Sequence, residues 1–435
     1  MRTMLVIATV GMTHGLLYSY DTVFSYIYRD DFRFSPAQSS FVDACNQFAW
    51  TIKPAFGALS DNFRLFGYQR KSYLILTAII CWICVFIFGL WVPLVALALI
   101  ILLLFNISMS FENCMAEAVL VQNTQGANRK GGITENEKVK VASRGVSTWF
   151  GSQYIGKITG ALLVMSFLQK SCRQSYLFWG SFAPLAGALM AFLLREKRRT
   201  KRECEHAYEH QNQIQGQEMT KPAEIELPHE IGRQEWPRSD DEQRLLNQNP
   251  TNNLKRAMQF LKNPLIFKSV LLVFLNGFIP ESPQVKFYYY TFGLGFHATF
   301  IGALKFISYV VVFLGVLVYN RYLRRINLKY FYTGMSIICC LLVSSQLIFI
   351  FRLTIQLGIS DKVFTAFDTF ILELFGQFHD LPILVLACGI CPKNIEATIF
   401  GLLMSVYSMG YMVSLQLGGL FTHLLGITST NFENL

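Results

Sequence analysis

The sequence predicts an all-α, polytopic membrane protein with about a dozen transmembrane helices. Hydrophobic residues make up 52% of the 435 residues and charged residues only 15%, whereas a soluble domain carries about 25% charged residues. The apolar residues come in long blocks, such as Ile75–Trp91 and Pro93–Ile107, and about 20 apolar residues cross a bilayer as a helix. The net charge of +10 comes from loops between the blocks, which is the positive-inside pattern and argues against nucleic-acid binding.

Eleven apolar segments are predicted to be transmembrane helices. They span residues 4–27, 37–59, 72–92, 94–121, 142–168, 174–195, 264–291, 297–320, 328–351, 363–389 and 393–425. Residues 196–262 are rich in Gln, Glu, Lys and Arg and poor in apolar runs, so we expect a cytoplasmic, largely disordered central loop there. The chain thus divides into an N-terminal transmembrane half, 1–195 with six helices, and a C-terminal half, 263–435 with five.

A faint internal repeat supports this division. The second predicted helix ends in Gly57–Asn62 and the eighth in Gly315–Asn320, and both stretches read Gly-x-Leu-x-x-Asn before a basic loop. The two helices are six apart, which is the relation expected of two parallel six-helix halves.

Two predicted helices carry a polar stripe. The stripes consist of Asn106, Ser110, Asn113 and Glu117 in the fourth helix and of Thr369, Glu373, Gln377 and Asp380 in the tenth. Residues three and four apart share one helix face, and a polar face at membrane depth requires protein or water opposite it. The carboxylates favour a solute cavity, while hydrogen bonding between helices is the structural alternative.

Five lysines fall within predicted helices, where a charge is costly and marks a candidate functional site. They are Lys53, Lys157, Lys268, Lys286 and Lys305. Lys157 is the deepest and follows the first glycine of the Gly156–Gly160 frame, whose Gly-x-x-x-Gly spacing allows close approach of another helix. It either binds an anionic solute or only neutralises a carboxylate, and the residues alone leave both readings open.

The sequence carries no recognisable enzyme or cofactor constellation. We find no phosphate-cradling loop and no set of zinc ligands, and the ten cysteines include two Cys-x-x-Cys pairs only in or at the end of apolar segments. Four histidines in or beside the predicted helices are scattered, and we interpret them as packed or hydrogen-bonded residues rather than proton relays: His14, His297, His379 and His423. We therefore expect neither enzyme activity nor a cofactor or bound metal.

Motifs spread over nearly the whole chain share their order with one known family. They are Ile52–Asp61, Leu65–Leu74, Phe287–Thr291, Leu294–Phe296, Tyr319–Asn320, Asp368, Gly376–Gln377, Pro382–Ala387, Cys391–Pro392, Glu396–Phe400, Leu403–Ser405 and Phe432–Leu435. Together they closely resemble the folate–biopterin transporter family, a branch of the major facilitator superfamily. The resemblance implies the major facilitator fold, alternating access, and symport of folate or pterin-like solutes with protons.

The resemblance also suggests roles for the polar residues. A pterin ring offers N–H donors that suit a carboxylate, and an anionic tail suits lysine. We therefore expect substrate binding by Asp368, Glu373, Gln377, Lys157, Lys286 and Asn113, and proton coupling by Glu117 or Glu373. The superfamily's inner-gate motif corresponds here to Asp61, Arg70 and Lys71, and we group Lys53 and Glu396 with this gate. The expected partners are the substrate, protons and membrane lipid, and the plasma membrane is favoured over an organelle membrane.

Several positions depart from the family pattern. Asn113 and Gln122 stand where carboxylates are usual, and Gly389 stands where Arg is usual. The chain also stops at Leu435, where the family's twelfth helix begins, and we interpret this as truncation rather than as an eleven-helix variant. These departures keep two alternatives open: a transporter of another small metabolite with the same fold, or a transport-dead receptor or assembly subunit.

The charge distribution predicts the orientation in the membrane. With the N-terminus inside, the short inner segments carry 14 Lys and Arg residues and the outer loops carry 6. Protease applied from the side of the N-terminus is therefore expected to cut within residues 196–262, and protease applied from the other side is not. Cleavage from the opposite side alone would contradict this orientation.

Overall fold

The computed structural model describes residues 2–128, 135–167, 172–194, 196, 264–323, 326, 328–351, 358–390, 396–429 and 431–432. Along the helices, the side chains at 61–62, 121–128, 135–147, 264–266, 269, 320, 328–329, 348–350, 382–390 and 396–400 are not described. The predicted central loop, except Glu196, therefore lies outside the described residues. The same holds for the side chains of Asp61, Gln122 and Glu396.

The described structure is helical, and every predicted transmembrane segment contains helix. The N-terminal half comprises α1 (Arg2–Leu17), α2 (Tyr20–Asp30), α3 (Pro36–Thr51), α4 (Lys53–Asn62), α5 (Lys71–Leu90), α6 (Val95–Asn128), α7 (Glu135–Phe167), α8 (Arg173–Gly180) and α9 (Ala183–Ala191). The C-terminal half comprises α13 (Pro264–Gly277), α14 (Pro283–Tyr288), α15 (Ala298–Val318), α16 (Leu328–Ile350), α18 (Asp361–Ile390) and α19 (Glu396–Leu424), with π-helical turns at Tyr289–Gly293 and Tyr319–Leu323. Four described helices are long and apolar enough to cross a membrane unbroken: α5, α6, α15 and α16.

Several spans predicted as continuous helices are broken. The break between α3 and α4 lies at Ile52, just before Pro54, and that between α8 and α9 lies just before Pro184. Proline lacks an N–H and its ring clashes with the carbonyl one turn earlier, so a helix ends near it. The break between α1 and α2 has another cause, because the hydroxyl of Ser19 donates to the carbonyl of Leu16 at 2.6 Å.

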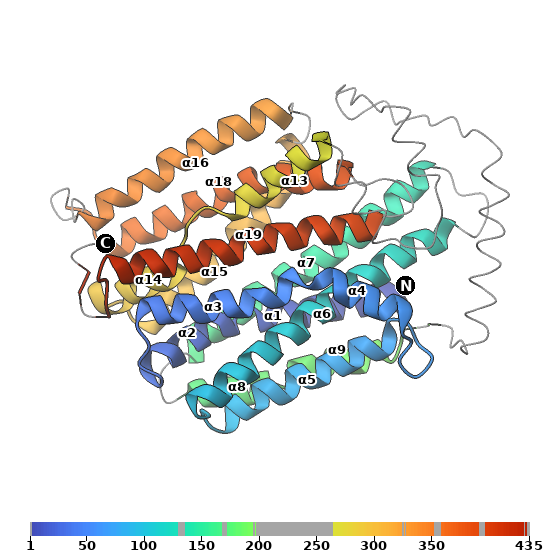
Figure 1. The fold of residues 1–435 in the computed structure, drawn as a ribbon, viewed down its shortest axis with the longest axis horizontal. Coiled ribbons are helices and arrows are strands. Elements are labelled where there is room, and N and C mark those ends of the chain that lie inside the picture. Colours follow the sequence, from blue (N-terminus) through green and yellow to red (C-terminus); the bar gives the residue numbers. More distant parts are fainter. Residues whose placement is uncertain are drawn as a thin grey trace.

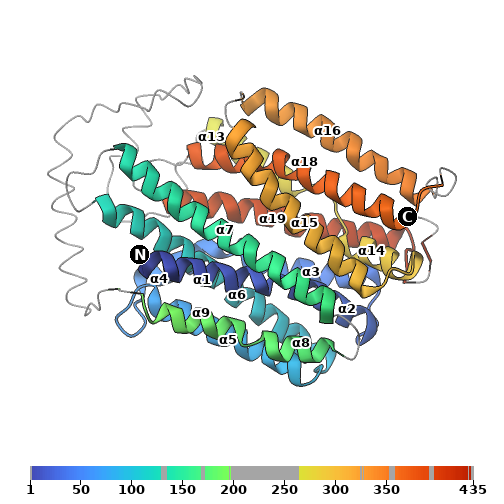
Figure 2. The same ribbon diagram turned by 180° about the vertical axis from the view of Figure 1, so that it is seen from behind.

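The two halves lie side by side, and their contacts include two long helix packings and the packing of α14 on α3. Helices α3 and α4 pack on α19, and α7 packs on α15 (Figures 1 and 2). The first span, α1 with α2, runs from the N-terminus to the opposite end of the bundle, where residues 31–35 lead into α3. We call that end the distal end and the end near the N-terminus the proximal end.

The apolar core is concentrated in the N-terminal half. Its distal cluster includes Tyr20, Phe24, Phe88 and Phe105, whose rings pack in tilted and edge-to-face contacts. A second cluster, nearer the proximal end, is built around Trp149, which is 1% exposed. These clusters hold α1, α2, α5, α6 and α7 together. Asn113 and Glu117 of the polar stripe on α6 contact α4 instead.

Helices α1 and α7 approach each other unusually closely. A Cβ placed on Gly156 would lie 2.1 Å from the carbonyl oxygen of Met12, and one placed on Gly15 would lie 2.0 Å from that of Gln153. Such distances are below van der Waals contact, so only glycine fits at this crossing. The Gly-x-x-x-Gly frame thus correctly predicted a close helix contact, and the contact brings Lys157 beside α1.

A methyl group at this crossing is expected to destabilise the fold. Gly156→Ala must push α1 away from α7, and overpacking of this kind costs about 1–3 kcal/mol. Thermal unfolding in detergent, followed by size-exclusion chromatography, should show a lower midpoint. Gly151→Ala on the same helix is the matched control, because a Cβ there meets nothing within 4 Å. Equal midpoints for the two variants would refute the role of the crossing.

Candidate functional site

Lys53 is a buried cation at the start of α4. It is 8% exposed, and its Nζ donates to Oδ1 of Asn113 at 2.6 Å. The same Nζ lies 3.7 Å from Oε1 of Glu117. Two residues of the predicted polar stripe of α6, Asn113 and Glu117, therefore contact Lys53. The break at Ile52 starts a new helix at this lysine and so places it against α6. The structure therefore joins Lys53 to the polar stripe, whereas the sequence grouped it with the gate.

Lys157 lies among tyrosine rings from both halves of the protein. Its Nζ is 4.3 Å from the ring centroid of Tyr18 in the turn between α1 and α2, 5.1 Å from that of Tyr154 on α7 and 5.9 Å from that of Tyr309 on α15. An ammonium group over aromatic faces is stabilised by their negative electrostatic potential. The cation therefore stands where the N-terminal and C-terminal halves meet.

Two aromatic rings connect the two lysines. The ring centroids of Tyr18 and Trp50 are 6.2 Å apart, and Trp50 also lies 4.9 Å from Nζ of Lys53. His14 packs against both rings, at 5.4 Å and 6.2 Å between centroids. We call Tyr18, Trp50, Lys53 and Lys157 the aromatic–lysine site.

Carboxylates from both halves act on this site. Asp21 of α2 and Glu373 of α18 both attract Lys157 electrostatically, and Asp21 also attracts Lys305 of α15. None of these pairs comes within 4 Å among the described residues. The side chain of Asp21 is solvent-accessible in the structure. Asp21 was not among the predicted substrate or proton-coupling residues.

The other predicted substrate residues lie apart from this site. Asp368 accepts a hydrogen bond from Gln346 at 3.2 Å and attracts the exposed Lys286, and both lie closer to the distal end. Gln377 packs against α15 at Gly315, where its Cγ would be 3.4 Å from a Cβ. The predicted set is thus divided into a central group with Lys157, Glu373 and Asn113 and a distal group with Asp368 and Lys286.

The predicted gate is organised around a carboxylate that sequence reasoning missed. Glu196 accepts hydrogen bonds from the backbone N–H groups of Gln69, Arg70 and Lys71 at 2.8–3.1 Å, at the N-terminus of α5. An anion is stabilised there by unpaired N–H groups and by the helix dipole. The guanidinium of Arg70 also donates to the hydroxyl of Ser60 on α4. Arg70 and Lys71 thus fasten the 63–71 connection to the residues that follow α9.

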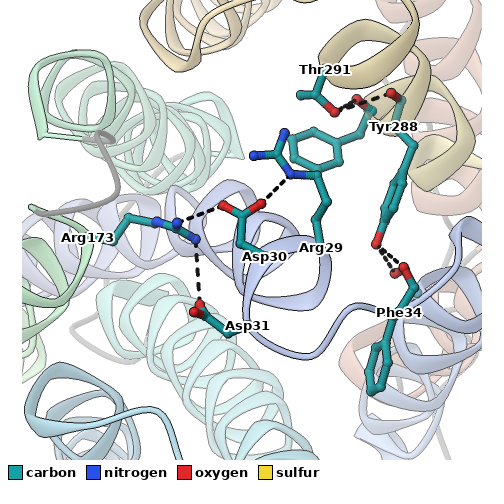
Figure 3. A network of polar contacts seen from close by, with 9 residues as sticks. Arg29, Asp30, Asp31, Phe34, Arg173, Tyr288 and Thr291 are labelled. Carbon is teal, nitrogen blue, oxygen red and sulfur yellow. Dashed lines mark hydrogen bonds and ion pairs between the residues drawn. The ribbon is translucent and has the colours of Figure 1, made fainter. Parts of the chain in front are cut away.

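A polar network closes the distal end of the bundle. Asp30 accepts hydrogen bonds from Arg29 at 2.6 Å and from Arg173 at 2.7 Å, as Figure 3 shows. The guanidinium of Arg29 lies over two rings of the C-terminal half, Phe287 at 5.8 Å and Phe292 at 5.0 Å. Arg29 therefore connects the two halves through cation–π contacts while Asp30 fixes its orientation.

Hydrogen bonds from α14 and its N-cap residue complete this closure. Gln284 donates to Asp43 at 2.6 Å, and the hydroxyl of Tyr288 donates to the carbonyl oxygen of Phe34 at 2.7 Å (Figure 3). The hydroxyls of Ser40 and Ser282, the N-cap of α14, lie 2.9 Å apart. All three pairs join the N-terminal half to the C-terminal half at the distal end. This conformation is therefore closed on that side of the aromatic–lysine site.

The helix arrangement is that of known transporters. The chain superposes on the nucleoside transporter NupG with a TM-score of 0.63 and 15% identity, covering 100% of this chain and 93% of that one. It superposes on a D-xylose–proton symporter with a TM-score of 0.60 and 12% identity, covering 95% and 90%. At these identities the likeness concerns the fold alone. The protein has the fold of a major facilitator transporter, as the sequence predicted.

Comparison of sequences identifies the family. A family model described as the BT1 family matches residues 11–435, and the chain belongs to this family of folate–biopterin transporters. The Folate-biopterin transporter of Synechocystis sp. is 27% identical over 432 residues, which cover 99% of this chain and 77% of the relative. Folate transporter 2 of Plasmodium falciparum is 24% identical, covering 100% and 83%. The chain is thus a multi-pass membrane transporter rather than an enzyme, which confirms the predicted family and class.

The distal closure can be tested with a single change of charge. Gln284→Glu replaces the amide that donates to Asp43 by a second carboxylate, which should destabilise the closed distal end. A shift of about 1.4 kcal/mol changes the population ratio of two conformations tenfold. Electron–electron resonance distances between spin labels on the distal ends of α3 and α15 should therefore lengthen. Gln346→Glu is the matched control, because its partner Asp368 lies on the neighbouring helix of the same half. Unchanged distances in Gln284→Glu would rule out this contact as a determinant of closure.

Proposed function

We propose that the protein is a secondary active transporter of folate or pterin-like anions that works by alternating access and is coupled to protons. The observation that carries this proposal is the aromatic–lysine site, with Lys157 enclosed by tyrosines of both halves and attracted by Asp21 and Glu373. The plasma membrane is the proposed location.

The chemistry of the site suits a flat heterocycle with an anionic tail. Tyr18 and Trp50 offer aromatic faces on which a planar ring can stack. Glu373 is the acid of α18 that attracts Lys157 electrostatically. We therefore assign to its carboxylate the role of accepting hydrogen bonds from the N–H groups of the pterin ring. Lys157 takes the tail carboxylate. Asp368 and Lys286 lie closer to the distal end. They provide a second pair of charges between the aromatic–lysine site and that end.

Placement between the halves supports alternating access. A site built from both halves is exposed to one side when one pair of helix ends separates and to the other side when the opposite ends separate. The structure holds the distal ends together through Arg29, Gln284 and Tyr288. We therefore assign this conformation to the state that opens toward the proximal side. With the orientation predicted from the charges, that side is the cytoplasm.

The contact between Lys53 and Glu117 offers a simple link between protons and substrate. While Glu117 is charged, it lies 3.7 Å from the ammonium of Lys53. Protonation of Glu117 removes that attraction and leaves Lys53 available to a substrate anion. Glu117 and Glu373 therefore remain our candidate proton carriers, one in each half.

A neutral metabolite such as a nucleoside is the second candidate substrate, because its base could also stack on Tyr18 and Trp50. Two lysines at the site favour an anion instead. A transport-dead receptor would bind the ligand without moving it. Uptake by proteoliposomes of folate, a neutral-tailed pterin and a nucleoside distinguishes these three functions.

Neutral substitutions should separate tail recognition from ring recognition. Lys157→Gln removes a charge-assisted contact worth about 1.5–3 kcal/mol, so the affinity for folate should fall roughly tenfold to a hundredfold. The affinity for a neutral-tailed pterin should stay nearly constant. Glu373→Gln should weaken both ligands. Binding is measured by scintillation proximity on purified protein, with Lys268→Gln on the exposed side of α13 as the control. An equal loss of both ligands in a folded Lys157→Gln variant would show that the tail assignment is wrong.

A further inference from the structure

The C-terminal half contains a polar network that the proposed substrate site does not use. Nδ1 of His379 lies 3.2 Å from Oδ1 of Asp380, and Nε2 lies 3.1 Å from the hydroxyl of Ser336 on α16. The ring also stacks on Tyr332, with centroids 4.8 Å apart. The sequence predicted a packed or hydrogen-bonded histidine, and the structure gives each ring nitrogen of His379 a polar partner.

Helix α13 completes the network. The amide of Asn276 donates to Oδ1 of Asp380 at 3.3 Å and accepts from the hydroxyl of Tyr332 at 3.4 Å. Three helices, α13, α16 and α18, therefore contribute to one hydrogen-bonded ring around the histidine. The side chain of His379 is 15% exposed and that of Asp380 is 48% exposed, so protons can reach the network through the carboxylate.

The hydrogen-bond network can hold an extra proton. If the hydroxyl of Ser336 donates its one hydrogen to the carbonyl oxygen of Tyr332, which lies 2.8 Å away, it accepts at Nε2. Nε2 must then carry a proton. At Nδ1, either the ring donates to a charged Asp380 or a protonated Asp380 donates to the ring. In both cases the pair holds one proton more than a neutral imidazole beside a charged carboxylate.

We propose that His379 and Asp380 form a proton-binding site, which carries the coupling proton in the distally closed conformation. The inference rests on the proton-coupling part of the proposed function, and it places a coupling proton at residues other than Glu117 and Glu373. Histidine is the side chain that changes charge near neutral pH, and an ionisable group at membrane depth marks a proton pathway. Movement of α13 or α16 relative to α18 breaks the ring of hydrogen bonds and releases the proton.

The other titratable groups near this pair are acidic or neutral. Asp380 acts electrostatically on Glu281 before α14, on Tyr407 of α19, on Tyr154 of α7 and on Cys339 of α16. Among the described residues, His379 is the one cationic partner within 4 Å of Asp380. A proton on this pair therefore relieves repulsion between Asp380 and Glu281 as well as completing the hydrogen bonds. Tyr154 also contacts Lys157, so it lies between the proton site and the aromatic–lysine site.

The first experiment detects the proton without any substrate. Nitrogen-15 spectra of histidine-labelled protein in nanodiscs, at neutral pH, should show one ring protonated on both nitrogens or hydrogen-bonded to a protonated carboxyl group. That signal should vanish in His379→Gln and change in Asp380→Asn. His423→Gln, at the exposed end of α19, should leave it intact. A wild-type spectrum in which the His379 ring carries one proton and no protonated carboxyl partner would overturn the proposal.

The second experiment tests coupling. Proteoliposomes with a trapped pH dye report proton flux driven by folate, and radiolabelled folate at equal concentrations on both sides reports exchange. We expect His379→Gln and Asp380→Asn to lose the proton flux and to keep the exchange, whereas Glu373→Gln loses substrate binding. Wild-type proton flux in His379→Gln would overturn the assignment of the coupling proton. If wild-type protein moves neither folate nor pterin but the nitrogen-15 signal behaves as expected, the proposed function fails and the proton-binding site stands.

Discussion

The contact between α1 and α7 at Gly15 and Gly156 determines where the central cation lies. Because the two backbones touch, Lys157 cannot extend into lipid along α7 and instead lies over Tyr18. An ammonium group at membrane depth is tolerated only with partners, and here tyrosine faces and two carboxylates supply them. The position of the cation at the boundary between the halves, and with it the chemistry of the site, depends on two residues that have no side chain.

At the closed distal end, too, each buried charge has a partner. Asp30 holds both Arg29 and Arg173, so the guanidinium of Arg29 is already oriented when it meets the aromatic rings of the C-terminal half. The hydrogen bonds between the halves at this end involve an amide, a phenol and hydroxyls, and the described residues form no direct ion pair between the halves there. A hydrogen bond contributes about 1 kcal/mol, or up to about 3 kcal/mol where one partner is charged, so such a closure can form and break within a transport cycle.

The sequence predicted the parts of this structure that follow from periodicity. The spacing of Asn113 and Glu117 placed them on one face of α6, and the glycine frame at Gly156 indicated a close crossing. The sequence alone could not identify Lys53 as the partner of Asn113 and Glu117, because that contact requires the helix break before Pro54. Tyr18 and Trp50 resemble ordinary core aromatics until their neighbours are known.

The same limit applies to partners that are far apart in sequence. Glu196 was counted as the first residue of a polar loop, yet it caps α5 more than a hundred residues earlier in the chain. His379 looked isolated because Asn276, Tyr332 and Ser336 come from two other helices. Charge and composition identify which residues are costly to bury, and only the tertiary structure shows what compensates each of them.

Helix α16 gives the membrane itself access to this network. It lies at the edge of the bundle beside α18, and much of its apolar surface, including Leu341 at 67% exposure, is free to contact lipid (Figures 1 and 2). Its inner face carries Tyr332 and Ser336, which contact His379 of α18. A bilayer whose hydrophobic thickness differs from the length of α16 tilts such a peripheral helix. We therefore expect lipid composition to affect the hydrogen bonds around His379.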